Sequence, residues 1–237
     1  MNQFTLRRYS FGDFLGLAED KAHPVLAEER KRIDADGDIP RLIAACGLKR
    51  GDAVIDVGGY ICDTALPFLW HGCYVTVFEP FVDAYVCGLY NTRHFPETCR
   101  CLNAPVGNGE WVRYVYECPG DNFGMRRMEV VPEGTAGAVK TVRLDNCEIV
   151  CECYDANFLG LNLIKIDAEG SEPTVLDGAK ELIARYRPKF YIEIYDDGLK
   201  NRGYTRSDVY DRLRALNYDW TVWGEEPRFD ILCTPRK

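Results

Sequence analysis

The chain has 237 residues, a hydrophobic fraction of 46% and a net charge of −8. This length suits one α/β domain with insertions, and the apolar fraction is enough for a sizeable core. The negative charge argues against a nucleic-acid substrate, because binding to a phosphate backbone needs a basic face. No apolar stretch reaches the length of a membrane span, and residues 1–8 lack the apolar core of a signal peptide. We therefore expect a cytoplasmic protein with no membrane partner.

Eleven cysteines raise the question of disulfides or metal. The odd count and the lack of any Cys-x-x-Cys pair argue against both. We interpret these cysteines as small buried apolar residues in a reducing compartment. Zinc at Cys147, Cys151 and Cys153 is the alternative.

Residues 1–50 predict a mainly helical cover ahead of a sheet domain, which we place at residues 51–237. Asp38 and Pro40 precede a helical apolar pattern that Gly47 ends. This segment is expected either to form a lid over a ligand or only to cover the sheet.

The next segment, Ala-Val-Ile-Asp-Val-Gly-Gly at 53–59, predicts a buried parallel strand followed by a tight turn. Asp56 lies inside that strand, so its carboxylate is expected to reach a polar ligand or nearby backbone N–H groups. Gly58 and Gly59 allow the backbone to bend and a ligand to approach without a Cβ in the way. A helix over 63–71 and a second apolar strand over 74–78 follow, and Glu79 ends that strand.

This order of elements is typical of nucleotide-binding folds that hold an adenosyl group: a strand, a glycine turn, a helix, a second strand and an acid. Glu79 lies 20 residues after Gly59 (79 − 59), as expected for an acid that accepts hydrogen bonds from ribose hydroxyls. The third glycine of the dinucleotide motif is missing, and Asp63 at the helix start would repel a pyrophosphate. A better ligand would be a cation with free ribose hydroxyls, which suits the three acids Asp56, Asp63 and Glu79. S-adenosylmethionine carries a sulfonium, an ammonium and an adenosine, so it fits this site better than NAD(P).

The remaining segments predict an α/β fold with one Rossmann-like sheet, helices on both faces and an antiparallel C-terminal strand pair. A strand over 99–103 ends at Asn103 and Ala104, near the expected adenine position. An alternating strand over 111–116 and a glycine-rich loop over 119–124 come next. Further strands are predicted at 139–143, 161–166 and 189–194. A capped helix over 207–216 precedes the closing strands at 219–223 and 229–234.

Residues 163–179 carry the strongest signal. The apolar strand delivers Asp167 and Glu169 to its carboxyl edge, where open α/β sheets bind ligands. Gly170 turns the chain, and Ser171 is expected to cap a helix whose apolar residues Val175, Leu176 and Ala179 face the sheet.

These motifs together resemble the FkbM-type methyltransferases, class I enzymes that use S-adenosylmethionine. The match rests on Val-Ile-Asp-Val-Gly-Gly at 54–59, Val-Phe-Glu-Pro at 77–80 and Leu-Ile-Lys-Ile-Asp-Ala-Glu-Gly-Ser-Glu at 163–172. Segments 139–145 and 188–193 add to it, so the resemblance spans about residues 50–235. Two positions depart from the family, which often has asparagine where Tyr60 stands and glycine where Cys62 stands.

The resemblance implies methylation of a hydroxyl on a sugar or another small natural product. Asp167, Glu169 and Glu193 are the candidate catalytic residues, either as a general base or as ligands of a divalent cation. Strand alternation is expected to point Lys165 away from Asp167. Tyr195, Trp111 and Trp223 are candidates for the acceptor pocket. The candidate cofactor-binding residues are Asp56, Gly58, Gly59, Tyr60, Asp63, Thr64, Glu79, Asn103, Ala104, Asp121, Asn122 and Asp167.

Two other functions stay open at this point. An NAD(P)-dependent oxidoreductase could use the same glycine turn and Glu79. A binding module could keep the cofactor fold without turnover, and the changes at Tyr60 and Cys62 are compatible with it. The oligomeric state and the identity of the acceptor do not follow from the sequence.

Overall fold

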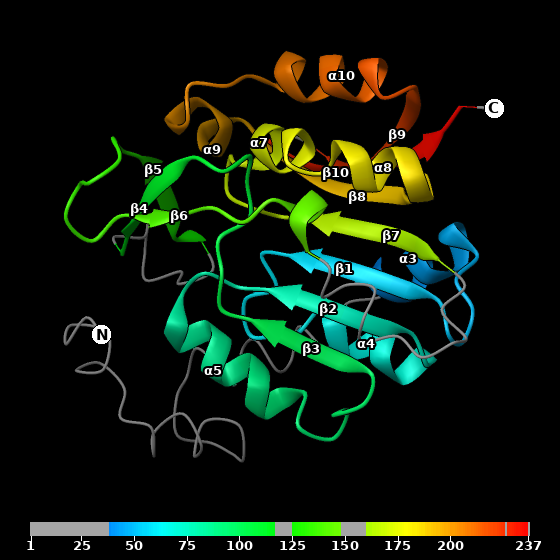
Figure 1. The fold of residues 1–237 in the computed structure, drawn as a ribbon. Helices are drawn as coiled ribbons and strands as arrows, with labels where there is room; N and C mark the ends of the chain where they lie inside the picture. The colour runs from blue at the N-terminus through cyan, green and yellow to red at the C-terminus, as the bar shows by residue number, and fades with distance from the viewer. Residues whose placement is uncertain (1–37, 117–124, 148–159, 226, 237) are drawn as a thin grey trace.

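The computed structural model describes residues 38–116, 125–147, 160–225 and 227–236. Its centre is a seven-stranded sheet in the order β3-β2-β1-β7-β8-β10-β9 (Figure 1). Five strands are parallel, and β10 runs antiparallel to both β8 and β9. The predicted α/β fold with an antiparallel C-terminal pair is therefore confirmed. The strands are β1 (Ala53–Val57), β2 (Tyr74–Phe78), β3 (Cys99–Leu102), β7 (Leu161–Ile166), β8 (Lys189–Tyr195), β9 (Tyr218–Glu225) and β10 (Arg228–Pro235).

Helices cover both faces of this sheet (Figure 1). One core cluster joins Ile55 and Ile164 to the apolar residues of α7 (Glu172–Asp177), α8 (Lys180–Tyr186) and α10 (Arg206–Ala215). The other joins Val54 and Leu163 to α3 (Asp38–Cys46) and α4 (Ala65–His71). Neighbouring residues of one strand enter opposite clusters because side chains alternate across a sheet. Apolar runs buried on both faces are what parallel strands require.

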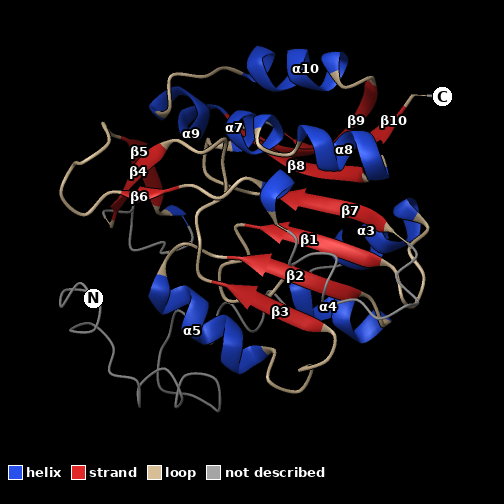
Figure 2. Cartoon of the chain, viewed as in Figure 1, coloured by secondary structure: helices blue, strands red, loops and turns tan. Residues whose placement is uncertain are grey.

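A second, three-stranded antiparallel sheet stands beyond the carboxyl ends of β1, β2 and β3 (Figure 2). It consists of β4 (Trp111–Val115), β5 (Arg127–Val130) and β6 (Val139–Lys140). The prediction of a strand over 139–143 in the main sheet is therefore wrong. Only two of its residues are a strand, and they pair with β4. Val142 then makes an isolated parallel bridge to Val106, and the short 3₁₀ helix η3 (Leu144–Asn146) follows.

Ser171 occupies the predicted N-cap position, but its side chain makes no capping hydrogen bond. Its hydroxyl is buried without a hydrogen-bond partner. The backbone of this turn is held instead by Glu172, whose carboxylate accepts the N–H groups of Ala168 and Gly170. The predicted helix ends at Asp177, so Ala179 lies beyond it. Gly178 allows a close approach of the backbone, because a Cβ there would lie 2.0 Å from the carbonyl oxygen of Gly107.

Two other helix ends were predicted correctly from local sequence, the start of α10 and the end of α3. Thr205 and Asp208 form the capping box of α10, and Gly47, at φ +64°, ends α3. The helices α5 (Val82–Asn91), α8 and α9 (Asp196–Asn201) were not predicted.

The N-terminal cover remains a prediction, because residues 1–37 lie outside the described residues. In the part of the chain that the structure describes, no helix is long and apolar enough to cross a bilayer.

The turn after β7 depends on a glycine that a side chain cannot replace. Gly170 has φ +97°, and a Cβ there would lie 2.0 Å from the carbonyl oxygen of Gly198. We expect Gly170→Ala to lower the free energy of unfolding by at least about 3 kcal/mol, the range of severe backbone and packing defects. Gly134→Ala is the matched control, since Gly134 has φ +84° but open space around it. It should cost only the backbone strain, about 1–2 kcal/mol. Equal losses in urea unfolding would show that the close approach to Gly198 is unimportant.

Candidate active site

A cavity of about 340 Å³ lies at the carboxyl ends of β1, β2, β7 and β8. Ligands of open parallel sheets bind at this edge, and small-molecule sites typically measure roughly 300–1,000 Å³. The cavity brings together nine of the residues predicted from the sequence. They are Gly58, Tyr60, Asp63, Thr64, Glu79, Ala104, Asp167, Glu169 and Glu193.

Other predicted residues do not line this cavity. Its lining includes neither the predicted cofactor residues Asp56, Gly59 and Asn103 nor the proposed acceptor residues Tyr195, Trp111 and Trp223. Asp121 and Asn122 lie outside the described residues, as do Cys151 and Cys153 of the alternative zinc site. Cys147, the third thiol of that site, is buried and donates to the carbonyl oxygen of Arg143.

Glu79 is a buried acid at the end of β2. Its two carboxylate oxygens accept the backbone N–H groups of Tyr60 at 2.9 Å and Phe81 at 2.7 Å. Burial raises the pKa of Glu79 to about 8, against the effect of these two hydrogen bonds. A carboxylate offers about four acceptor positions, so two remain for ligand hydroxyls. Asn103 shapes this corner indirectly, because its amide donates to the carbonyl oxygens of Glu79 and Pro80.

The turn after β1 holds two non-glycine residues in the left-handed region, Tyr60 at φ +47° and Cys62 at φ +64°. These are the two positions at which the chain departs from the FkbM pattern of asparagine and glycine. Asparagine and glycine adopt positive φ more readily than other residues do. The structure therefore gives a physical reason for that pattern, and each departure stores backbone strain of about 1–3 kcal/mol.

Gly58 and Gly59 are needed for packing more than for a ligand. A Cβ at Gly58 would lie 1.7 Å from the carbonyl oxygen of Asp167. One at Gly59 would lie 2.1 Å from the side chain of Val77. Gly58 has φ +81°, as the predicted tight turn requires, and it lines the cavity. The expectation that the missing Cβ at Gly59 makes room for a ligand is wrong, because Val77 fills that space.

Asp56 finds different partners from those expected. Its carboxylate is fully buried and accepts the hydroxyl of Thr64 at 2.7 Å and Lys165 Nζ at 3.1 Å. Lys165 Nζ also lies 3.6 Å from Asp167. The expectation that Lys165 points away from Asp167 is therefore wrong, because residues two apart on a strand share a face. Burial alone would lower the pKa of Lys165, but Asp56 and Asp167 outweigh it and raise that pKa. These two acid contacts favour the protonated form of Lys165, which argues against a role as general base.

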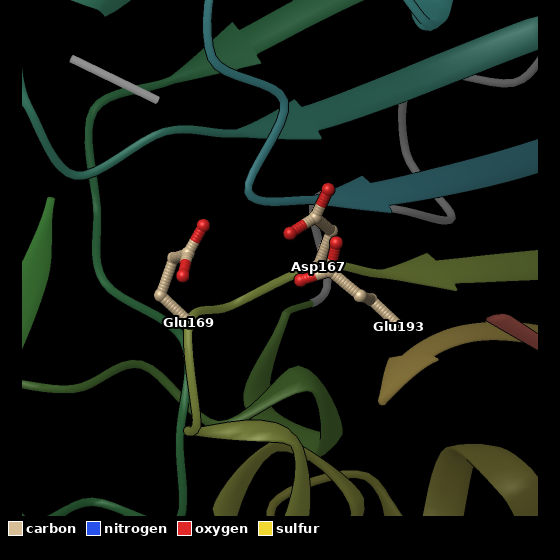
Figure 3. Close-up of side chains that lie close together, drawn as sticks. All are labelled: Asp167, Glu169 and Glu193. Atoms are coloured by element: carbon tan, nitrogen blue, oxygen red, sulfur yellow. The ribbon is translucent and has the colours of Figure 1, made fainter. Parts of the chain in front are cut away.

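The three candidate catalytic acids lie close together (Figure 3), and all three line the cavity. Asp167 and Glu169 follow β7, and Glu193 belongs to the neighbouring β8. One carboxylate oxygen from each lies within 4.8 Å of the others. Acids this close repel one another, and burial adds to the cost of ionisation.

Arg228 on β10 is a site residue that the sequence analysis missed. Its guanidinium donates from Nε and Nη2 to the two oxygens of Glu193, and Nη2 also donates to Glu169 at 2.9 Å. Asp167 is farther away, at 3.9 Å. Burial, followed by the charge of Asp167, raises the pKa of Glu169 to about 7 despite the contact with Arg228. The same two causes raise the pKa of Glu193.

The acid cluster has a geometry that would also suit a hard cation with oxygen ligands. Among the residues described, it is the only group of three or more potential ligands that meets this spacing. Arg228 already supplies positive charge at Glu193 and Glu169, so a cation here would have to share or displace that guanidinium. The donor set therefore favours Arg228 over a metal as the counter-charge of the cluster.

Comparison with known proteins agrees with this architecture. The sequence model of the Methyltransferase FkbM domain matches residues 56–219. The methyltransferase FkbM from Methylobacillus flagellatus KT has a similar structure, with a TM-score of 0.53, 16% identity and coverage of 98% of this chain. The present chain covers 60% of that protein. No curated protein matches the sequence.

Two further solved structures share the fold. One is magnesium protoporphyrin IX methyltransferase from Synechocystis PCC 6803 with bound S-adenosylmethionine (SAM), which has a TM-score of 0.53 and 7% identity. The match covers 98% of this chain and 94% of that protein. The other is a SAM-dependent methyltransferase from Aquifex aeolicus, with a TM-score of 0.50 and 12% identity. The match covers 90% of this chain and 98% of that protein. At such identities the likeness shows the fold alone. The family match spans more than half of the chain, so the chain belongs to the FkbM methyltransferase family.

Proposed function

We propose that this protein transfers a methyl group from S-adenosylmethionine to a hydroxyl of a small acceptor, such as a sugar or another natural product. The observation that supports this most is one cavity that joins a buried acid after β2, Glu79, to the acid cluster after β7 and in β8. Membership in a methyltransferase family favours methyl transfer over hydride transfer from NAD(P)H.

The residues of the cavity fit the proposed cofactor. Glu79 has acceptor positions for the ribose hydroxyls, and Ala104 lines the neighbouring wall, where we place the adenine. Gly58, Asp63 and Asp167 would face the methionine end, where negative side chains suit an ammonium and a sulfonium. When bound, S-adenosylmethionine supplies a methyl group that is already activated, so the chain must position the acceptor and remove its proton.

Glu169 is the best placed of the three acids to take that proton. Both oxygens of Glu193 are occupied by Arg228, whereas Arg228 binds only Oε1 of Glu169. The pKa of Glu169, about 7, also lies where a general base works efficiently. We assign Glu169 as the base, Glu193 as the anchor of Arg228, and Asp167 as the acid that faces the transferring methyl.

The function is tested with purified protein, methyl-labelled S-adenosylmethionine and a panel of sugars, phenols and amines. We expect label in a hydroxyl-bearing acceptor and release of S-adenosylhomocysteine. Label in amines alone would contradict O-methylation. Tight cofactor binding without product across the panel would support the silent binding module instead.

Glu79 should make cofactor affinity depend on pH. If the ionised carboxylate binds the ribose, affinity should rise with pH and level off above the pKa of about 8. Below that pKa the change should approach about tenfold per pH unit, because one proton must leave for binding. Calorimetry with S-adenosylhomocysteine between pH 6 and 9 measures it. Glu79→Gln should bind more weakly and lose this pH dependence, whereas exposed Glu133→Gln should behave like the unaltered protein. An unchanged profile in Glu79→Gln would exclude the ribose assignment.

Glu169 should control the chemical step without controlling cofactor binding. At saturating cofactor, kcat should rise with pH through about 7, since a carboxylate base acts only when deprotonated. Glu169→Gln should lower kcat by about 100-fold or more, the usual contribution of a general base, and abolish that rise. Its dissociation constant for S-adenosylhomocysteine should stay within about threefold of the original, a change under 1 kcal/mol. Full turnover in Glu169→Gln would move the base to another acid.

Turnover should not need a divalent cation, because Arg228 supplies the counter-charge of the acid cluster. Activity after exhaustive chelation should equal that of untreated enzyme, and added Mg²⁺ should not raise it. A loss on chelation that Mg²⁺ restores would instead make the acids metal ligands. Arg228→Met offers a second readout, since removal of the guanidinium leaves the three acids free to bind Mg²⁺, which calorimetry detects.

A further inference from the structure

Three cysteines gather behind the turn that follows β1. Cys62 Sγ lies 3.6 Å from Cys101 Sγ, and Cys101 Sγ lies 3.9 Å from Cys99 Sγ. Cys62 lies within the turn itself, while Cys99 and Cys101 share one face of β3, the end strand of the seven-stranded sheet (Figure 1). The turn that lines the cavity is thus in direct contact with thiols on a strand at the edge of the sheet.

Cys62 has little freedom to move away from Cys101. Its φ is +64°, and its backbone N–H donates to the carbonyl oxygen of Gly59 at 2.7 Å. On the side of α5, a Cβ at Gly88 would lie 2.7 Å from Cys62 Sγ, so the helix packs tightly against this sulfur. Cys62 is 1% exposed, whereas Cys99 and Cys101 are each partly exposed. Solvent therefore reaches the cluster from β3.

The arrangement favours a dithiol pair over a ready-made metal site. In the described part of the chain, no cysteine belongs to a set of three ligands that all lie within 4.8 Å of one another. Cys101 is instead the middle member of a row. Its contacts with the thiols of Cys62 and Cys99 lower the pKa of Cys101, which favours the reactive thiolate.

We propose that Cys62 and Cys101 form a reversible disulfide under oxidising conditions. Cys101 is the more exposed member of the pair, so hydrogen peroxide would oxidise its sulfur to a sulfenic acid, with cleavage of the O–O bond and release of water. The Cys62 sulfur would then attack Cys101, form the S–S bond and expel a second water. Two thiols thereby give two electrons and two protons to one peroxide. A dithiol such as dithiothreitol reverses the bond.

Disulfide formation would alter the cavity. The sulfur atoms must approach from 3.6 Å to about 2.05 Å. Because Cys62 is held at φ +64° and packs tightly against Gly88 of α5, we expect the turn to shift with its side chain. Tyr60, Asp63 and Thr64 line the cavity from the same turn, and the Tyr60 N–H binds Glu79. Oxidation should therefore weaken binding in this cavity. This consequence rests on the proposed cofactor site, whereas the cross-link itself does not.

Peptide mapping tests the cross-link directly. The full chain is reduced, treated with hydrogen peroxide, alkylated and digested with trypsin without further reduction. Trypsin cleaves after Arg100, so Cys99 and Cys101 fall in different peptides, 94–100 and 101–113. We expect peptide 101–113 to be joined to peptide 51–93. Cleavage after aromatic residues then separates Cys62 from Cys73 and Cys87. Free Cys101, or a bond from Cys101 to any other cysteine, would overturn the proposal.

Variants separate the cross-link from general oxidation. Cys101→Ser should abolish the joined peptide, and Cys99→Ser, on the same face of the same strand, should leave it intact. Both variants should bind S-adenosylhomocysteine normally when reduced. Peroxide should weaken binding by about fivefold or more in the original chain and in Cys99→Ser, a magnitude typical of coupling between sites. It should not weaken binding in Cys101→Ser.

The outcomes for the cofactor and for the thiols are distinguishable. If the reduced protein does not bind S-adenosylhomocysteine, the proposed cofactor fails while the peptide map still decides the disulfide. If the disulfide forms and affinity is unchanged, the link between the thiols and the cavity is wrong.

Discussion

The buried ion pair between Asp56 and Lys165 ties together β1 and β7, two central strands of the sheet. The Asp56 side chain is 0% exposed and that of Lys165 is 6% exposed, so each charge depends on the other. Loss of one partner from such a pair typically costs about 3–5 kcal/mol, because an uncompensated charge stays buried. The pair extends to Thr64 in the turn after β1 and to Asp167 after β7. The geometry of the cavity wall therefore depends on this one interaction.

Two basic residues, Lys165 and Arg228, contact the acids at the carboxyl edge of the sheet. Lys165 neutralises the β1 side, and Arg228 neutralises the β8 side through Glu193. Asp167 lies between them, 3.6 Å from Lys165 and 3.9 Å from Arg228, and therefore feels both charges without a direct hydrogen bond to either. Its carboxylate keeps its acceptor positions for a ligand. These two cations face four carboxyl groups, those of Asp56, Asp167, Glu169 and Glu193, so the edge has no surplus of positive charge and disfavours a phosphate.

The sequence predicted the parts of the fold that local patterns determine. Apolar runs bounded by glycine and acids correctly predicted the strands β1, β2, β7 and β8. The ends of these strands then placed Glu79, Asp167 and Glu169 at one edge of the sheet. Contacts between distant segments were not predictable in this way. Arg228 meets Glu193 only because β10 pairs antiparallel with β8, and that register depends on tertiary structure. The close approach of Gly107 to Gly178 likewise joins distant segments, and no local pattern reveals it.

The turn between β1 and α4 is where the cavity and the thiols meet, and Cys62 is one of its two strained non-glycine residues. A glycine at this position would adopt φ +64° without strain, whereas cysteine stores about 1–3 kcal/mol there. Burial of a small apolar thiol offsets part of that cost. The same side chain places a sulfur 3.6 Å from Cys101, a contact that glycine could not make. The strained residue at position 62 is therefore also the one that can form the proposed disulfide with Cys101. It lies in the segment that positions the Tyr60 N–H against Glu79.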